Sequence, residues 1–101
     1  MAKLIKDGEV AVLVSGGFGA GWSTWGKTES AVDGELAQAI LDGEDKNVWR
    51  AIAAKNWPEQ YDGGVEDLYV VWVPQGAAYE ITEYDGSESL NIISNQTYQI
   101  A

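Results

Sequence analysis

The sequence contains no cysteine and no histidine. Without cysteine, the chain cannot form disulfides, thiol nucleophiles or zinc sites that depend on thiolates. Without histidine, it lacks the usual general base near neutral pH and the commonest metal ligand. Ser-His-Asp catalysis, Cys-His catalysis and His-containing zinc sites are therefore excluded. Any acid–base chemistry would have to use Asp and Glu, and no spacing of carboxylates singles out a catalytic pair. We therefore expect a protein that is not an enzyme and that carries no cofactor or metal.

Basic residues are also scarce, with 6 Lys and Arg against 16 Asp and Glu and a formal net charge of −10. All the basic residues lie within residues 1–55. Residues 56–101 contain only acidic charges, at Glu59, Asp62, Glu66, Asp67, Glu80, Glu83, Asp85 and Glu88. This half should not bind nucleic-acid phosphates or an anionic membrane, which have the same sign of charge. It is either a solubilising surface or an acidic face that docks on a basic protein surface.

Long hydrophobic runs are absent as well. The run Val10–Val14 near the start is too short for a signal peptide or a membrane span, so we expect a cytoplasmic protein. The length of 101 residues fits a single domain over 1–101, and 46% hydrophobic residues with five Trp and five Tyr can supply its core.

Hydrophobic patterning predicts an α+β fold: a mostly antiparallel sheet of about four to five strands with two short helices packed on one face. The segment Ser30-Ala31-Val32-Asp33 fits a capping box at the start of the first helix, with Asp33 as an alternative N-cap, and Asp45 is the candidate N-cap of the second helix. A short connection at Gly43 should join the two helices. The segment from Leu68 to Val73 is apolar on both faces and predicts a central strand that contains Trp72. The remaining strands are expected over 9–14, 79–84, 90–93 and 97–100.

A glycine-rich segment at 15–26 follows the first long strand and carries the aromatic residues Phe18, Trp22 and Trp25. Such segments can hold phosphates, but Trp22 stands where Walker-type spacing requires Lys, and the dinucleotide pattern of glycines is incomplete. The segment is either a lid over the core or an aromatic interaction loop, in which Trp22 and Trp25 are the better surface candidates. The alternative function is a small-ligand binder, for a nucleotide or a sugar, or a minor enzyme that uses this loop.

A second candidate region surrounds the expected hairpin turn at Asp85-Gly86. Its carboxylates could offer oxygen ligands to Ca²⁺ or Mg²⁺, but they lack the EF-hand arrangement and are more typical of an exposed acidic hairpin. The candidate binding residues of the whole chain are therefore Phe18, Trp22, Trp25, Glu80, Glu83, Asp85 and Glu88, and none is assigned a catalytic or metal-binding role.

Three segments carry a resemblance to other proteins: Gly19-Ala20-Gly21-Trp22-Ser23-Thr24-Trp25, Val71-Trp72-Val73-Pro74-Gln75-Gly76 and Glu83-Tyr84-Asp85-Gly86-Ser87-Glu88. Together they resemble short uncharacterised proteins of bacteriophages and prophages, a family to which no activity is attached. The resemblance implies a small protein made in a bacterial cytoplasm during infection. The sequence thus predicts a non-catalytic, acidic accessory protein that contacts a basic host or phage macromolecule, as an inhibitor or a nucleic-acid mimic.

Overall fold

The computed structural model describes residues 2–93 and 99–100. These residues form two α-helices, α1 (Gly34–Leu41) and α2 (Lys46–Asn56), and three short 3-10 helices, η1 (Ser23–Trp25), η2 (Thr28–Val32) and η3 (Val65–Asp67). The strands are β1 (Ile5–Lys6), β2 (Glu9–Ser15), β3 (Leu68–Pro74), β4 (Ala78–Tyr84), β5 (Ser87–Ile93) and β6 (Gln99–Ile100). The α+β class is confirmed, and every strand pair is antiparallel.

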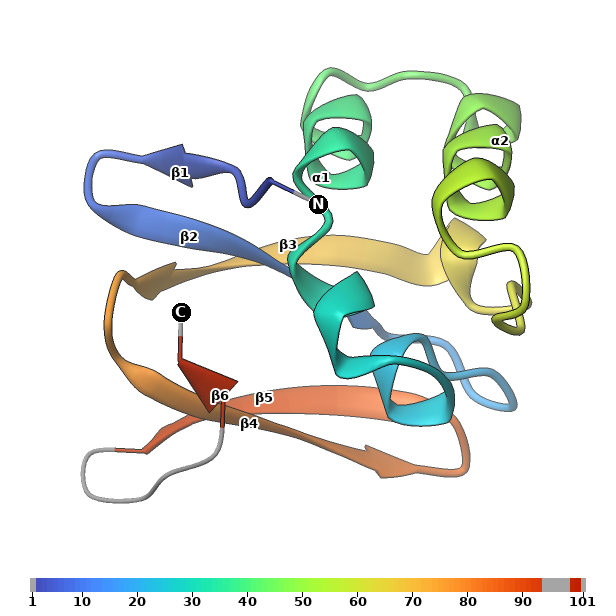
Figure 1. The fold of residues 1–101 in the computed structure, drawn as a ribbon. Coiled ribbons are helices and arrows are strands. Elements are labelled where there is room, and N and C mark those ends of the chain that lie inside the picture. The colour runs from blue at the N-terminus through green and yellow to red at the C-terminus, as the bar shows by residue number, and fades with distance from the viewer. Residues whose placement is uncertain (1, 94–98, 101) are drawn as a thin grey trace.

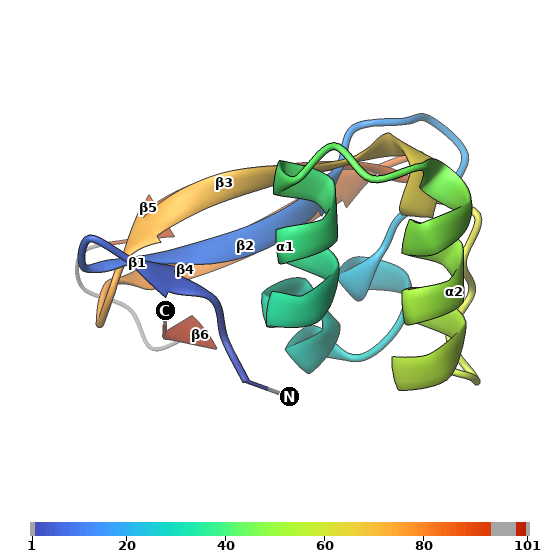
Figure 2. The same cartoon turned by 90° about the horizontal axis from the view of Figure 1, so that it is seen from above.

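The strands are divided between two sheets, where the sequence predicted one. The first has the order β1-β2-β3 and the second the order β5-β4-β6. In Figure 1 the first sheet lies between the two helices above and the second sheet below. Figure 2 shows α1 and α2 side by side. The physical reason for the division is that β2 is apolar on both faces and must be covered on both.

The core accordingly lies on both sides of β2, where the five residues from Val10 to Val14 have no exposed surface. Ala11 and Leu13 belong to a cluster that includes Leu36 of α1 and Trp49 of α2. Residues on the opposite face of β2, Val10 and Val12, belong to a second cluster with Val73 of β3 and Tyr79 of β4. The alternation of side chains along a strand thus sends half of this run to the helices and half to the second sheet.

The position of β3 differs from the prediction of a central strand. It lies at the edge of its sheet, while β2 is central. Both faces of β3 are nevertheless covered, because Val70 and Trp72 pack on the helix side and Val71 and Val73 on the side of the second sheet. Because β3 packs between the helices and the second sheet, it has apolar residues on both faces, a pattern that is also typical of a central strand.

Asp33 and Asp45 are confirmed as the N-caps of α1 and α2, whereas the predicted capping box at Ser30 is wrong because Ser30 lies within η2. The carboxylate of Asp33 accepts hydrogen bonds from the backbone N–H groups of Glu35 and Leu36 at 3.0 and 3.1 Å, and that of Asp45 accepts one from Asn47 at 2.7 Å. These bonds satisfy donors that a helix start leaves unpaired. Of the predicted strand 97–100, β6 accounts for residues 99–100, and residues 97 and 98 lie outside the described residues. Within the described chain, no helix has the length and apolar character needed to cross a membrane.

Candidate functional site

The glycine-rich segment packs against the turn between β4 and β5. The backbone N–H of Gly19 donates to the carbonyl oxygen of Asp85. Asp85 and Gly86 both have positive φ, 53° and 88°, which is the geometry of a two-residue hairpin turn. A side chain at Gly86 would overlap the backbone nitrogen of Ala20. Glycine is therefore required there for two reasons, the left-handed backbone and the close approach of the loop.

Glu88, the second residue of β5, is the centre of this arrangement. Its side chain is 2% exposed, and its carboxylate accepts four hydrogen bonds. The donors are the backbone N–H groups of Ser15 at 2.9 Å, Trp22 at 2.7 Å and Thr24 at 3.1 Å, and the Oγ1 hydroxyl of Thr24 at 2.6 Å. Bonds of backbone and hydroxyl donors to an ionised acceptor are among the stronger hydrogen bonds in proteins. Glu88 therefore holds the start and the end of the glycine-rich segment together.

The buried carboxylate of Glu88 argues against the alternative that the glycine-rich segment binds a phosphate. A phosphate-binding loop turns its backbone N–H groups toward an external anion. Here the N–H groups of Ser15, Trp22 and Thr24 already bind the anion that Glu88 supplies. The loop is thus built around an internal anion, and an external phosphate would have to displace a buried carboxylate from four donors.

Trp22, which the sequence favoured as a surface residue, is fully buried. Its indole Nε1–H donates to the carbonyl oxygen of Ser30 at 2.9 Å, and its ring belongs to the core cluster beneath the helices. The prediction of surface exposure is wrong for Trp22 because the loop folds back over the end of β2, where a large apolar ring is needed to close the core. At Trp22, the glycine-rich segment is therefore a lid over the core, which is one of the two interpretations given above.

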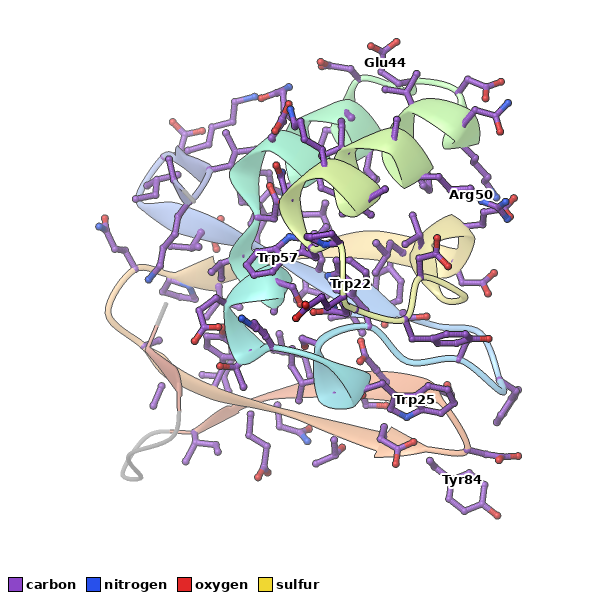
Figure 3. The ribbon with its side chains drawn as sticks, turned by 45° about the vertical axis from the view of Figure 1, so that its right-hand side comes forward. Trp22, Trp25, Glu44, Arg50, Trp57 and Tyr84 are labelled. Atoms are coloured by element: carbon purple, nitrogen blue, oxygen red, sulfur yellow. The ribbon has the colours of Figure 1, made fainter. Side chains whose placement is uncertain are left out.

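Other aromatic side chains at this end of the molecule are exposed, from 42% for Trp25 to 79% for Tyr84. Trp25 packs on Tyr61 with ring centroids 5.8 Å apart, and Tyr69 lies against Gly16. Trp25 and Tyr84 are seen together on the lower right of Figure 3. We call this surface the aromatic end; it consists of Phe18, Trp25, Tyr61, Tyr69 and Tyr84, which are all the exposed aromatic side chains among the described residues.

Exposed carboxylates lie among these rings. The Asp67 carboxylate lies beside Gly17, Asp85 stands at the hairpin turn, and Glu83 accepts a hydrogen bond from the backbone N–H of Gly86 at 2.8 Å. Glu80 lies nearer the start of β4, with its neighbours Tyr79 and Ile81 turned toward the core. Strand alternation therefore turns Glu80 to the outer face of the second sheet.

The structure thus brings together four of the seven predicted binding residues, Phe18, Trp25, Glu83 and Asp85. Trp22 and Glu88 are buried and cannot contact a partner in this conformation. Sequence reasoning missed Tyr61, Tyr69 and Tyr84. A usable signal existed for Tyr61, which opens a turn-rich segment, and for Tyr84, which precedes the Asp-Gly turn.

Basic charge near the helices is partly neutralised by ion pairs. Arg50 of α2 pairs with Glu66 of η3, and the Nζ of Lys55 lies 2.6 Å from a carboxylate oxygen of Glu35. The hydrogen bonds that Glu35 accepts from Lys55 and Asn56 lower the pKa of its carboxyl group. In the core between the sheets, burial raises the pKa of the Tyr79 phenol.

Two hollows flank η1, each of about 350 Å³. One is lined by hydroxyl groups and a carboxylate, from residues that include Ser23, Thr24, Thr28 and Glu83. The other is lined by Trp25, Gly26, Lys27, Asn56, Trp57, Pro58, Glu59 and Gln60. In the part of the chain that the structure describes, no group of three or more acidic side chains is arranged to hold a metal ion.

Comparison of the chain with protein-family models, with curated proteins and with solved structures gives no match.

Proposed function

We propose that the protein is a non-catalytic binding protein whose aromatic end contacts a basic surface of a host or phage macromolecule. The observation that carries this proposal is that five exposed aromatic side chains lie on the glycine-rich segment, on the hairpin turn that it contacts and on the segments that pack beside them. Tyr and Trp are over-represented among the residues that dominate binding energy at protein interfaces. Several large apolar side chains exposed in one region of a small protein are typical of an interaction site.

Charge supports a basic partner. Glu83, Asp85 and Asp67 are exposed among the rings, and all the charged residues within 56–101 are acidic. A carboxylate can bind a guanidinium through paired hydrogen bonds, and an aromatic face can stack on it. The aromatic end thus has two kinds of group that arginine prefers, which suits a basic surface rich in Arg.

Surfaces rich in Arg and Lys are the parts of nucleic-acid-binding proteins that contact phosphates. A protein that occupied such a surface would block the nucleic acid, so we propose an inhibitor that acts as a nucleic-acid mimic. The resemblance to phage and prophage proteins suggests the bacterial cytoplasm during infection as the setting. The long-range attraction of a net charge of −10 would accelerate encounter with a basic partner.

The test is affinity capture from a bacterial lysate at low salt, with a matched set of variants. Phe18→Ser combined with Tyr84→Ser should abolish retention of the partner, because both side chains are exposed and their loss leaves the core intact. Ile5→Ser and Leu41→Ser remove exposed apolar side chains outside the aromatic end and should leave retention unchanged. If both pairs of variants retain the same proteins, the aromatic end is not the binding surface.

The role of charge is tested on the association rate of the captured partner. Glu83→Gln with Asp85→Asn should slow association and flatten its dependence on salt. Asp42→Asn with Glu44→Gln makes the same change of charge at the end of α1, and Glu44 lies near the top of Figure 3, far from Trp25 and Tyr84. An equal slowing by both pairs would show that only net charge matters, and no slowing by either would remove the basic partner from the proposal.

A further inference from the structure

The hollow between η1 and the end of α2 has the features of a ligand site. We call it the Trp25–Trp57 groove, after the two aromatic residues among those that line it. Its volume of about 350 Å³ lies within the range of small-molecule sites, which begins at about 300 Å³. Such sites combine apolar walls with a few polar groups that orient the ligand.

The walls of the groove are held in place by a ring contact and by hydrogen bonds. The ring of Trp25 packs on Tyr61, and the indole Nε1–H of Trp57 donates to the buried carboxylate of Asp33 at 2.9 Å. Gln60 joins the two sides, because its Oε1 accepts from the backbone N–H of Lys27 at 3.0 Å and its Nε2 donates to the hydroxyl of Ser30 at 2.8 Å. A site prepared in this way loses little conformational freedom when a ligand binds.

The polar groups of the groove identify the class of ligand. Lys27 and Glu59 are both exposed, and neither side chain forms a hydrogen bond or an ion pair with another of the described residues. Because these two groups have opposite charge, an anionic or a cationic ligand would meet one like charge. A neutral ligand rich in hydroxyl groups can instead accept from the ammonium and donate to the carboxylate, since each hydroxyl does both.

We propose that the Trp25–Trp57 groove binds pyranose rings of a neutral saccharide. The C–H face of a pyranose is apolar and would lie against an indole ring, which offers a large apolar surface with a polar edge. The ring hydroxyls would reach Lys27 and Glu59 at the rim. This site is separate from the backbone donors of the glycine-rich segment, which Glu88 occupies. It shares Trp25 with the aromatic end, but saccharide binding does not require that the aromatic end binds a macromolecule.

The experiment follows the indole N–H signals of the ¹⁵N-labelled full chain by NMR during titration with cellobiose, lactose and chitobiose. At least one of these disaccharides should shift the Trp25 and Trp57 signals in a saturable way. Trp49 is an internal control, because it is 8% exposed and lies in the core beneath the helices. Trp25→Ala should weaken the affinity by about tenfold or more, as expected for an aromatic anchor, while Leu41→Ala should leave it unchanged. The Trp57 and Trp49 signals of the Trp25→Ala variant report that it remains folded.

A separate arm of the titration uses arginine amide, a cation with a planar head group. Saturable shifts of Trp25 and Trp57 with arginine amide and none with the disaccharides would overturn the saccharide proposal, because the groove would then serve a basic partner. The absence of saturable shifts with any disaccharide at roughly 50 mM, enough to detect millimolar affinity, would also overturn it. Equal affinity of the wild-type protein and the Trp25→Ala variant would show that the sugar binds elsewhere, and this result would also overturn the saccharide proposal.

Discussion

Replacement of Glu88 tests whether the internal anion organises the glycine-rich segment. In the wild-type protein, one carboxylate oxygen accepts from Ser15 and the other accepts three bonds, one from Trp22 and two from Thr24. Glu88→Ala removes all four acceptor contacts. Glu88→Gln keeps the shape of the side chain but removes the charge and turns one acceptor into a donor.

The expected cost of each variant follows from the burial of the donors. The bonds from Ser15 and Trp22 are buried, whereas both bonds from Thr24 are partly exposed, so that water can replace their acceptor. A buried donor left without a partner costs about 1–3 kcal/mol, so two such donors make Glu88→Ala cost about 4 kcal/mol. In Glu88→Gln the amide oxygen can serve the three-donor position while its NH₂ group faces the N–H of Ser15. The loss of that one bond and of the charge should cost about 2 kcal/mol.

The assay is equilibrium unfolding in urea, followed by tryptophan fluorescence, with Glu83→Gln as the matched control. Glu83 is the cross-strand partner of Glu88, but it is exposed, so its replacement should change the unfolding free energy by no more than about 0.5 kcal/mol. We expect stability to fall in the order wild type, Glu88→Gln, Glu88→Ala. If Glu88→Ala proves as stable as Glu83→Gln, Glu88 does not hold the loop and the reasoning is refuted.

Three further predictions concern the core and the loop. Trp22→Ala should lower the unfolding free energy by about 3–5 kcal/mol, as for other buried aromatic residues, and Trp25→Ala by much less; equal losses in urea unfolding would contradict the assignment of Trp22 to the core. Because burial raises the pKa of Tyr79, its neutral form stabilises the fold below the unfolded-state value of about 10, and this contribution is lost as the pH rises through the folded-state pKa. Tyr79→Phe should therefore reduce the alkaline loss of stability between about pH 9 and 11, measured by urea unfolding at each pH; an unchanged alkaline loss would contradict this. Gly86→Ala should destabilise the protein and speed amide exchange at Gly19, whose N–H bonds to the hairpin turn; unchanged exchange would show that the loop does not depend on this contact.

The parts of the fold that were predicted correctly depend on local signals. Asp33 and Asp45 cap helices whose first N–H groups lie two or three residues away, so a short window of sequence contains the cap and its donors. The hairpin turn at Asp85-Gly86 is equally local, because both residues must adopt positive φ. Its register is tighter than expected, since Tyr84 pairs directly with Ser87.

The parts that were not predicted depend on partners far apart in the chain. In the sequence, nothing distinguishes Glu88 from the acidic residues expected at the surface. The donors of the hydrogen bonds that its carboxylate accepts lie 64 to 73 residues away in the chain. The division into two sheets has a similar cause, because the turn after Pro74 would also suit two strands of one sheet. Trp22 was misplaced because its glycine neighbours suggest an exposed loop, whereas the loop folds back over the core. The aromatic end was recognised only in part because Tyr61, Tyr69 and Tyr84 come from three separate segments.

The central claim, that the aromatic end is the binding surface, is tested most directly by site-specific photocrosslinking in bacterial cells. A photoreactive phenylalanine analogue would be placed at Phe18 and at Tyr84 in separate variants, and at Ile5 and Leu41 as exposed control positions outside the aromatic end. We predict that the analogue at Phe18 and at Tyr84 crosslinks to the same macromolecule and that neither control does. Crosslinking of that macromolecule from Ile5 or Leu41 but from neither aromatic position would contradict the account.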